Sequence, residues 1–553
     1  MLTRLLLAFL ATHCAFGADC VGNKACSSCH SAIYRAYMQT PMAQSSGKVG
    51  AQDQTENFGA AEFRDTRGAF SYTVRPDYQF QFTQLGQRVQ QPINGRRNLA
   101  YFVGSGAAAR TFLIDSGGFL FESPVTYYRR SNSWKASPGF EGLDYPNLTR
   151  PITPGCLQCH ASGIQPKEGT LNGYEAKPFL ENGVACERCH GAGSDHVAFF
   201  SAAQRTTPVR PEGAKMVNPA KLAPAARDSI CAQCHLSGEV RVLKTGQQES
   251  HALAPGALLD DILTVFVRRG SPSELRVTSH VENLAQSACK RASGDKLWCA
   301  TCHDPHTTPE PAAKAAYFRG KCLSCHQVQD CRTTQEARRA NSDDCTACHM
   351  PRGPSSDVEH VVFTDHSIRR KPASPVSPKS APQAPTLELV PYYSYTATTR
   401  DLALANAMVA LRDYNNADRQ RAFGLLKQAA EQDTADAVAL VYLAEFYRDA
   451  KDDAHALPIY EQVWRMDRTQ YAAAAALGAY QMQRGNFAGA IEFWRQALAS
   501  NPAMTLVRVN LATALLRTGQ VDEAKAVLEK ALEFNPVSPE ARELLTRISG
   551  PAK

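Results

Sequence analysis

The sequence predicts a multidomain protein: a mostly α-helical and irregular region with a small β-rich insertion, followed by an all-α solenoid. Three observations predict this class. The 553 residues exceed what a single hydrophobic core supports. The pattern Cys-x-x-Cys-His recurs along the first two thirds of the chain, and a 34-residue period runs through the last third.

The first 17 residues, MLTRLLLAFLATHCAFG, predict a secretory signal peptide. Arg4 provides the basic start, LLLAFLA the apolar stretch, and Ala15 and Gly17 are small residues at the cleavage positions. No later run approaches the roughly 18 uninterrupted apolar residues of a membrane span. We therefore expect an exported, periplasmic protein that is soluble and has no transmembrane segment.

The Cys-x-x-Cys-His pattern, numbered here as motifs 1 to 7 in chain order, is the attachment signature of haem c. The cysteines expected to form thioethers are Cys26, Cys29, Cys156, Cys159, Cys186, Cys189, Cys231, Cys234, Cys299, Cys302, Cys322, Cys325, Cys345 and Cys348. The histidines expected as proximal iron ligands are His30, His160, His190, His235, His303, His326 and His349. A zinc site, a thioredoxin-like motif or a disulfide scaffold would not require seven identical triplets. We expect seven covalently attached haem groups.

The formal net charge of +7 is a weak indication of acidic partners. Two propionates and one ferric porphyrin centre give each oxidised haem a net charge of −1. Seven haems therefore bring the total close to zero once the signal peptide, with Arg4, is removed. We expect no nucleic-acid partner.

The stretch CATCHDPH, residues 299–306, contains a second histidine, His306, three residues after His303. His306 starts on the same side of the ring that His303 would ligate, and the macrocycle blocks its route to the opposite face. If it ligates an iron, that iron belongs to a neighbouring haem. Such loops would bring haems close together, as a one-electron relay requires.

Too few histidines remain to give every iron a second histidine ligand. Outside the motifs and the signal peptide, and apart from His455 in the helical region, the candidates for distal ligands are His196, His251, His280, His306, His360 and His366. His251 is the weakest, because it lies in a polar stretch. Met42 is a candidate for the first haem, and a methionine ligand would raise its potential. An open iron is the other outcome. The sequence leaves Cys20, Cys289 and Cys331 unassigned.

The stretch between motifs 1 and 2 is predicted to form antiparallel strands. FSYTV and YQFQF alternate apolar and polar residues, and RTFLI and FLFES follow, with turn residues between them. We therefore expect an N-terminal haem segment at 18–57, a β-rich insertion at 58–130 and a multihaem domain with sparse regular structure at 131–370. Porphyrins would form much of the core of that domain.

A proline-rich linker is predicted at 371–395, followed by helical repeats at 396–553. Ala422, Ala456, Ala490 and Ala524 are each 34 residues apart, and Gly485 and Gly519 share the period. This period resembles the tetratricopeptide repeat (TPR), with about four copies and a capping helix in PEARELLTRI. Such a solenoid offers a concave surface to a protein partner. It also serves elsewhere as a spacer or dimerisation unit.

The cysteine-rich region resembles the multihaem cytochrome superfamily that includes hydroxylamine oxidoreductase and its tetrahaem electron acceptor. The resemblance rests on GVACERCHGAGSDH, CATCHDPH and DCTACHMPR. It implies haems packed in parallel and perpendicular pairs, mostly with two histidine ligands. The catalytic Cys-x-x-Cys-Lys site of related nitrite reductases is absent, and the crosslinking tyrosine of the oxidoreductase has no assignable counterpart.

These features favour an exported heptahaem c-type cytochrome that relays electrons between redox protein partners and docks through its TPR domain. The alternative is a multihaem oxidoreductase acting on a small nitrogen or sulfur species at an open or weakly ligated haem. A third hypothesis is a repeat-built assembly protein with haems for stability. No catalytic residue is assignable from the sequence.

Overall fold

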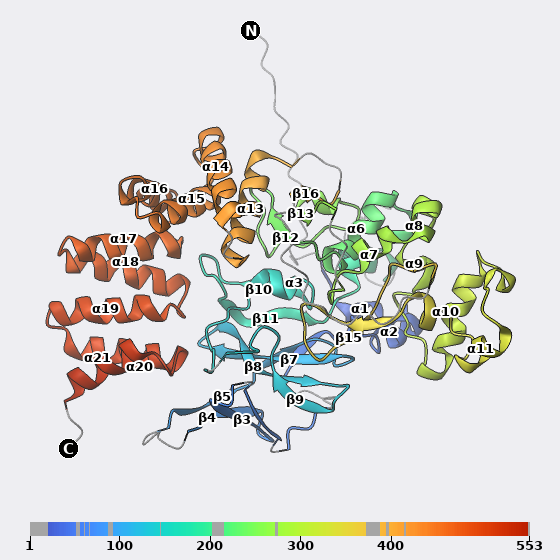
Figure 1. The fold of residues 1–553 in the computed structure, drawn as a ribbon, viewed down its shortest axis with the longest axis horizontal. Coiled ribbons are helices and arrows are strands. Elements are labelled where there is room, and N and C mark those ends of the chain that lie inside the picture. Colours follow the sequence, from blue (N-terminus) through green and yellow to red (C-terminus); the bar gives the residue numbers. More distant parts are fainter. Residues whose placement is uncertain are drawn as a thin grey trace, which may run out of the picture.

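A computed structural model of the chain describes residues 20–50, 56–59, 61–65, 67–86, 92–143, 145–201, 215–270, 275–371, 388–393, 397–413 and 416–550. The expected signal peptide lies outside these residues. The repeats form a stack of helices along one side of the molecule, and the motif-bearing region and the strands lie beside it (Figure 1).

Two antiparallel sheets follow motif 1. Their strands are β1 (Ser46–Lys48), β2 (Ala61–Arg64), β3 (Phe70–Arg75), β4 (Gln79–Gln84), β5 (Asn94–Asn98), β6 (Tyr101–Val103), β7 (Ala109–Ser116), β8 (Phe119–Tyr128) and β9 (Ser133–Ala136). The strand orders are β1-β6-β7-β8-β9 and β2-β3-β4-β5. The strands therefore extend on both sides of the expected 58–130 span. Phe70, Tyr72 and Val74 of β3 are buried and alternate with less buried neighbours, as the period of two predicts.

A second hairpin joins motifs 2 and 3. It consists of β10 (Ala161–Pro166) and β11 (Tyr174–Asn182), and Ala161 pairs with Asn182 at its open end. Motif 2 ends at His160, one residue before β10, and motif 3 begins at Cys186, shortly after β11. The hairpin therefore brings these two motifs together.

Short helices are the commonest regular elements between motif 2 and residue 371, and α1 and α2 lie around motif 1. These helices are α1 (Asn23–Cys26), α2 (Ser31–Tyr37), α3 (Pro154–Gln158), α4 (Glu187–His190), α5 (Ser194–Phe200), α6 (Pro224–His235), α7 (His280–Gln286), α8 (Ala288–Ser293), α9 (Cys299–Cys302), α10 (Lys314–Leu323), α11 (Gln335–Ala340) and α12 (Cys345–His349). Turns of 3-10 helix lie at Pro219–Lys221, Leu259–Asp261, Gly294–Lys296, Pro311–Ala313 and Val328–Asp330, and β14 (Arg352–Pro354) pairs with β15 (Val362–Thr364).

Part of the expected linker is a strand. β16 (Leu389–Pro391) pairs with β13 (Leu263–Arg268), which also pairs with β12 (Val240–Leu243). Residues 372–387 of that linker lie outside the described residues. The chain thus returns to the motif-bearing region before the repeats begin, because Leu389 is buried in the same apolar cluster as the first repeat helix.

The repeats form four helical pairs and a final helix within the described residues 397–550. The pairs are α13 (Thr399–Asp413) with α14 (Asn416–Gln432), α15 (Ala437–Asp449) with α16 (Asp453–Met466), α17 (Tyr471–Gln483) with α18 (Phe487–Ser500), and α19 (Thr505–Arg517) with α20 (Val521–Phe534), followed by α21 (Pro539–Ser549). The alanines that repeat every 34 residues are all fully buried on the second helix of each pair. Only so small a side chain allows the paired helices to approach this closely.

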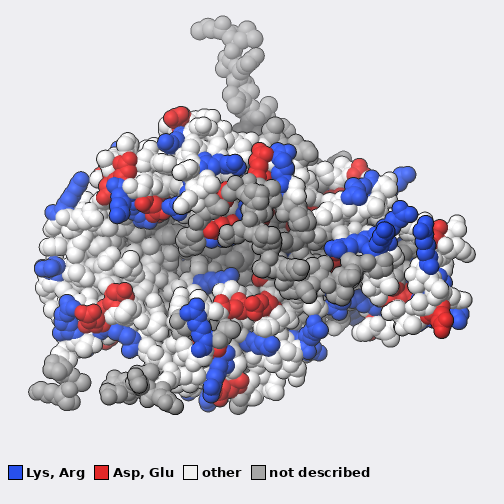
Figure 2. Space-filling view, viewed as in Figure 1, with Lys and Arg blue, Asp and Glu red and all other residues white. Residues whose placement is uncertain are grey.

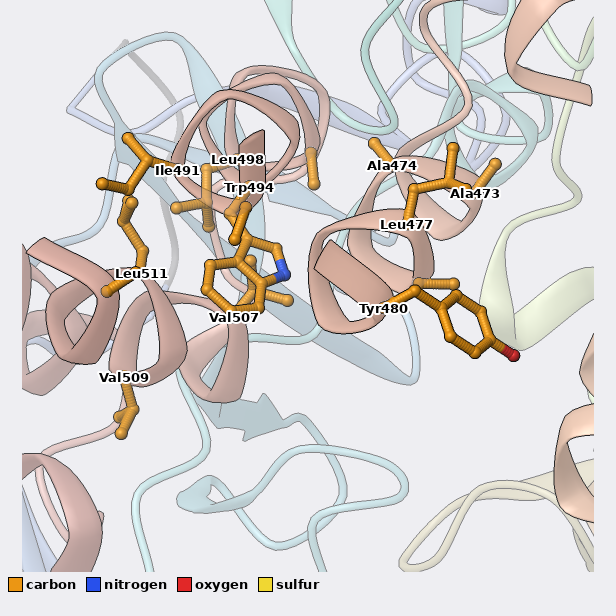
Figure 3. Close-up of a cluster of buried hydrophobic side chains, with 14 of the residues drawn as sticks. Ala473, Ala474, Leu477, Tyr480, Ile491, Trp494, Leu498, Val507, Val509 and Leu511 are labelled. Atoms are coloured by element: carbon orange, nitrogen blue, oxygen red, sulfur yellow. The ribbon is translucent and has the colours of Figure 1, made fainter. Parts of the chain in front are cut away.

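The core of the repeats alternates small and large side chains (Figure 3). Trp494 is buried and donates from its indole nitrogen to the carbonyl of Ala475 at 3.1 Å. A Cβ atom at Gly478 would lie 2.4 Å from that nitrogen, so the glycine makes room for the indole. Gly485 and Gly519 adopt positive φ angles of 73° and 78° where the first helix of a pair ends.

The solenoid contacts the rest of the protein at both of its ends. Near its C-terminal end, Phe534 packs edge-on against Phe121 of β8, with ring centres 5.4 Å apart, and Arg97 donates to the carbonyl of Glu533 at 2.6 Å. At its start, Lys244 pairs with Asp401 at 2.9 Å. These contacts fix the repeats to the strands.

The longest helices among the described residues, α14 and α13, belong to the repeats. Among the described residues, no helix is both long and apolar enough to cross a lipid bilayer.

Substituting Phe534→Ala is expected to destabilise the protein and to loosen the C-terminal end of the solenoid from β8. Phe534 is 3 % exposed, so the cavity should cost about 3 kcal/mol of unfolding free energy. Denaturant unfolding measures that loss, and hydrogen exchange of β8 measures the loosening. Val521→Ala is the control on the same helix, since Val521 is 46 % exposed and should change stability by no more than about 0.5 kcal/mol. Equal effects of the two substitutions would contradict the docking.

Candidate haem-binding site

Each motif forms about one helical turn. The backbone N–H of the motif histidine donates to the carbonyl of the first cysteine at 2.9 Å for His30 and 3.0 Å for His190, His303 and His326. Residues at positions i, i+3 and i+4 of a helix share one face. The spacing therefore places both thiols and the imidazole of a motif on the same side of the backbone, as attachment to one porphyrin requires.

Cysteines of different motifs lie against one another. Hydrogen-bonding side-chain pairs join motifs 1 and 3 (Cys26 and Cys186), motifs 2 and 4 (Cys159 and Cys234), motifs 4 and 5 (Cys231 and Cys299), and motifs 6 and 7 (Cys322 and Cys345). Motifs more than a hundred residues apart are thus neighbours in space.

The contacts between thiols change their acidity. The hydrogen bond with Cys186 lowers the pKa of the Cys26 thiol to about 7. The hydrogen bond with Cys234 lowers the pKa of Cys159 to about 6, and the guanidinium groups of Arg241 and Arg188 act in the same direction against the effect of burial. Burial is the main cause of the raised pKa of Cys189.

Glu187, between the two cysteines of motif 3, attaches the N-terminal segment to that motif. Its carboxylate accepts hydrogen bonds from the backbone N–H groups of Val21 at 3.0 Å and Gly22 at 2.9 Å, just before motif 1. It also accepts from Gly193 at 2.9 Å, next to the start of α5, the helix that bears His196. Glu187 is 5 % exposed, so this single carboxylate fixes motif 1 and α5 relative to motif 3.

Arg188, the next residue, connects motif 3 to motifs 2 and 4. Its guanidinium donates to the side-chain oxygen and the carbonyl of Gln158, both at 3.0 Å, and to the side-chain oxygen of Gln233 at 2.7 Å. Gln158 and Gln233 are the residues directly before the second cysteines of motifs 2 and 4. Arg188 is also 5 % exposed. The two residues between Cys186 and Cys189 therefore organise the first four motifs.

Three candidate distal histidines face a motif histidine. The ring centres are 6.4 Å apart for His30 and His196, 5.9 Å for His190 and His306, and 6.2 Å for His303 and His366, with interplanar angles of 19°, 13° and 31°. Two imidazoles bonded to one metal ion at about 2 Å per bond would have ring centres roughly 6 Å apart. The distance between the ring centres of each pair therefore matches that of two histidine ligands on one iron.

The protonation of several of these rings also fits ligation. His190, His349 and His366 place Nδ1 within 2.7–2.9 Å of the carbonyl oxygens of Val217, Arg369 and Thr364. A carbonyl only accepts, so Nδ1 carries the proton and Nε2 keeps the lone pair that a metal needs.

His280 lies close to His235 of motif 4, but in a different geometry. The two ring centres are 5.0 Å apart and nearly perpendicular, and His366 lies 4.7 Å from His280. Burial, together with the neighbouring rings of His235, His366 and His303, lowers the pKa of His280 to about 3. Nδ1 of both His235 and His280 is buried without a partner. This cluster holds neutral imidazoles at the junction of motifs 4 and 5.

The remaining candidates, His251, His360 and Met42, make other contacts, and His251 lines a cavity next to Gln158 of motif 2. His251 contacts Gln247 at 3.0 Å, and His360 packs edge-on against Tyr128 at 5.2 Å. The carbonyl of Met42 accepts from Val184, just before motif 3, at 2.9 Å and from Ser45, whose hydroxyl also donates to the carbonyl of His160. The backbone of Met42 thus lies at motifs 2 and 3, while the ring facing His30 is that of His196.

One long segment folds without a core of its own. None of the residues 298–360, all of which the structure describes, is buried, although they form α9 to α12 and carry motifs 5 to 7. Helices this short are not stable in water without packing. A large apolar group held among them would supply that packing, and seven thiol pairs with following histidines are the donor set of haem c.

Comparisons with known proteins identify two regions of the chain. Residues 135–191, which span motifs 2 and 3 and the hairpin between them, match the family model described as cytochrome c554 and c-prime. Residues 481–548 match a model of the tetratricopeptide repeat. The chain thus has a cytochrome c554-like region and TPR repeats. No curated protein matches the chain.

Some solved structures resemble part of the chain at low TM-scores. A double mutant of MamA is 17 % identical with a TM-score of 0.25, and covers 28 % of this chain and 85 % of its own. YrrB, described as a TPR protein with an unusual peptide-binding site, is 19 % identical with a TM-score of 0.24, and covers 26 % of this chain and 75 % of its own.

Sequence reasoning missed the side chains that hold the motifs together. Glu187, Arg188, Gln158 and Gln233 all occupy the positions between the two cysteines of a motif, where attachment itself sets no residue type. The available signal was that these positions carry two charges in motif 3, inside a region expected to be closely packed.

Glu187→Ala is expected to release the N-terminal segment from motif 3. Three backbone N–H groups would lose a charged acceptor, each bond being worth about 1.5–3 kcal/mol. Amide exchange in residues 20–30 should therefore speed up by at least about tenfold. Glu175→Ala, at an exposed position on β11, is the matched control and should leave these rates unchanged. Unchanged protection in Glu187→Ala would show that other contacts hold the segment.

Proposed function

We propose that this protein is an exported heptahaem c-type cytochrome that relays electrons between redox partners, with its repeats as the docking module. The observation that carries the proposal is the spacing of the three histidine pairs, each of which matches that of two imidazole ligands on one iron. The cytochrome c554-like match across motifs 2 and 3 supports it.

Haem c supplies reversible one-electron chemistry at its iron. The chain contributes the thiols that bond each group and the histidines that ligate it. In this proposal each of the three candidate histidines is the second ligand of an iron bound to a motif histidine. The pairs are His30 with His196, His190 with His306, and His303 with His366. His306 would then connect motif 5 to motif 3, in line with the expectation that it ligates the iron of a neighbouring haem.

The contacts between motifs indicate the order of the relay. Motifs 1 and 3, 4 and 5, and 6 and 7 touch through their cysteines. Cys189 of motif 3 lies close to Cys231 of motif 4, and Cys302 of motif 5 lies close to Cys322 of motif 6. The order 1-3-4-5-6-7 follows, with motif 2 beside motif 4. Electron tunnelling falls steeply with distance, so such contacts favour transfer along this order.

The repeats provide a surface for a protein partner. A cavity of about 450 Å³ lies between α17, α18 and α19 and is lined by Tyr480, Trp494, Met504, Leu506 and Asn510, among others. Leu506 is 66 % exposed there. Basic and acidic side chains are mixed over the face seen in Figure 2.

A second candidate function is oxidoreduction of a small nitrogen or sulfur species at motif 2. Nδ1 of His160 is buried without a partner, and the structure gives this ring no facing histidine among the described residues. A cavity of about 250 Å³ lies near motif 2, lined by Gln158, Arg188 and His251 among others. An open iron at this motif would face a polar cavity.

The proposal is tested on protein matured in a host that attaches haem c. Intact mass should show seven haems per chain, and fewer would contradict the count. Electron paramagnetic resonance of the oxidised protein then separates the two functions. Low-spin signals alone favour the relay. A high-spin signal that nitrite, hydroxylamine or cyanide abolishes favours the oxidoreductase.

His306→Ala is expected to convert about one iron per chain from low spin to high spin, because the iron bound to His190 loses its second imidazole. The spectrum of the oxidised protein measures this conversion. His455→Ala removes an exposed histidine of the repeats and should leave the spectrum unchanged. A wild-type spectrum for His306→Ala would remove His306 from the ligand set.

Preventing haem attachment is expected to unfold residues 298–360 while the repeats stay folded. This segment buries no side chain of its own, whereas the repeats have a continuous apolar core. Hydrogen exchange of protein made without haem maturation should show full exchange of α10 and protection of α18. Protection of α10 without haem would contradict the idea that the cofactor is its core.

A further inference from the structure

We propose that Arg188 raises the reduction potentials of the haems attached at motifs 2, 3 and 4 above those of motifs 6 and 7. This inference rests on the proposed function, because it requires haem at these motifs. In the relay, the haems at the junction of motifs 2, 3 and 4 would then be reduced before those of motifs 6 and 7, because their reduction potentials are higher.

Arg188 is placed at this junction by hydrogen bonds. It follows Cys186 by two residues within motif 3, and its guanidinium reaches Gln158 of motif 2 and Gln233 of motif 4 at 2.7–3.0 Å. The guanidinium is thus held by neighbours of the thioether-forming cysteines of three motifs. At 5 % exposure, water screens it little.

The charge of Arg188 is not neutralised by the surrounding residues. Both side chains that hold it are neutral amides, and its Nε has no hydrogen-bond partner. No carboxylate forms an ion pair with it within the described part of the chain. In a haem attached at one of these motifs, the propionates would lie on the porphyrin edge opposite the thioether bonds, away from the cysteines of that motif. A guanidinium keeps its proton in proteins, so the positive charge persists.

Two further charged side chains lie near these motifs. Arg241 adds a second positive charge at motifs 2 and 4, where it donates to the carbonyl of Gln233 at 2.7 Å. Glu249 provides an opposing charge at the other end of motif 2, where it accepts from Gly155 at 3.0 Å.

The sign of the effect follows from charge alone. Reduction adds one negative charge to the iron and its porphyrin, so a nearby unscreened positive charge favours the reduced state. The potentials of the haems at motifs 2, 3 and 4 therefore rise. Motifs 6 and 7 lie in the 298–360 segment, where no side chain is buried and solvent screening is stronger.

Potentiometric titration of matured Arg188→Gln tests the proposal. Glutamine removes the charge and keeps a hydrogen-bond donor, so the highest potentials of the titration should fall while the lowest stay unchanged. Arg188→Lys keeps the charge but not the forked geometry, and should retain the wild-type potentials. Arg484→Gln, at an exposed turn of the repeats, controls for loss of a distant charge and should change nothing.

Three results would overturn the proposal: unchanged potentials in Arg188→Gln, an equal fall in Arg188→Lys, or a uniform fall of all potentials. The second result would show that Arg188 acts through structure and not through charge. If Arg188→Gln does not bind its full set of haems, Arg241→Gln is measured in its place. We then expect a smaller fall of the same potentials, and unchanged potentials would overturn the proposal. Intact mass separates a failure of the proposed function from a failure of this inference. A wild-type protein with fewer than seven haems would contradict the proposed function before any potential is measured.

Discussion

The arrangement of the first four motifs depends on the two side chains between Cys186 and Cys189. Glu187 reaches the backbone before motif 1, and Arg188 reaches Gln158 and Gln233. Both side chains are nearly inaccessible to solvent, and a buried charge without hydrogen bonds is very costly. The cost of breaking these bonds keeps motifs that lie far apart in sequence in one fixed cluster. Every contact between cysteines of motifs 1 to 4 is built on that cluster.

The parts that sequence predicts well are those set by local periodicity. A spacing of three and four residues places the thiols and imidazole of a motif on one face, a period of two buries Phe70 and Tyr72, and a period of 34 places Ala456 and Ala490 in the repeat core. Partnerships across the chain could not be predicted this way. His196, His306 and His366 were recognisable as candidates, yet which motif each one faces depends on the hairpin and on the Glu187 contacts. Likewise, the three residues of β16 carry no pattern of their own that would distinguish them from the expected linker.

The molecule contains two kinds of folded region. The sheets and the repeats have apolar cores made of their own side chains, such as Phe112 and Trp494. Residues 298–360 have none. The repeats also contact the strands near Phe121 and the three-stranded sheet near Lys244. A docking surface fixed at both ends holds a bound partner in a defined position relative to motifs 1 to 4, as a relay of the proposed kind requires.

The identity of the residues that hold Arg188 is itself informative. An aspartate or glutamate at position 158 or 233 would accept the same hydrogen bonds and would bind a guanidinium more strongly. It would also cancel the charge. The two glutamines hold the guanidinium of Arg188 in position but do not neutralise its charge. The guanidinium donates to three neutral oxygens, two from Gln158 and one from Gln233. A site selected for stability alone would be expected to use a carboxylate here, as Glu56 does for the buried Arg110 at 2.7 Å. The contrast between these two arginines supports the proposal that the positive charge at the junction of motifs 2, 3 and 4 acts on the haems proposed to be attached there.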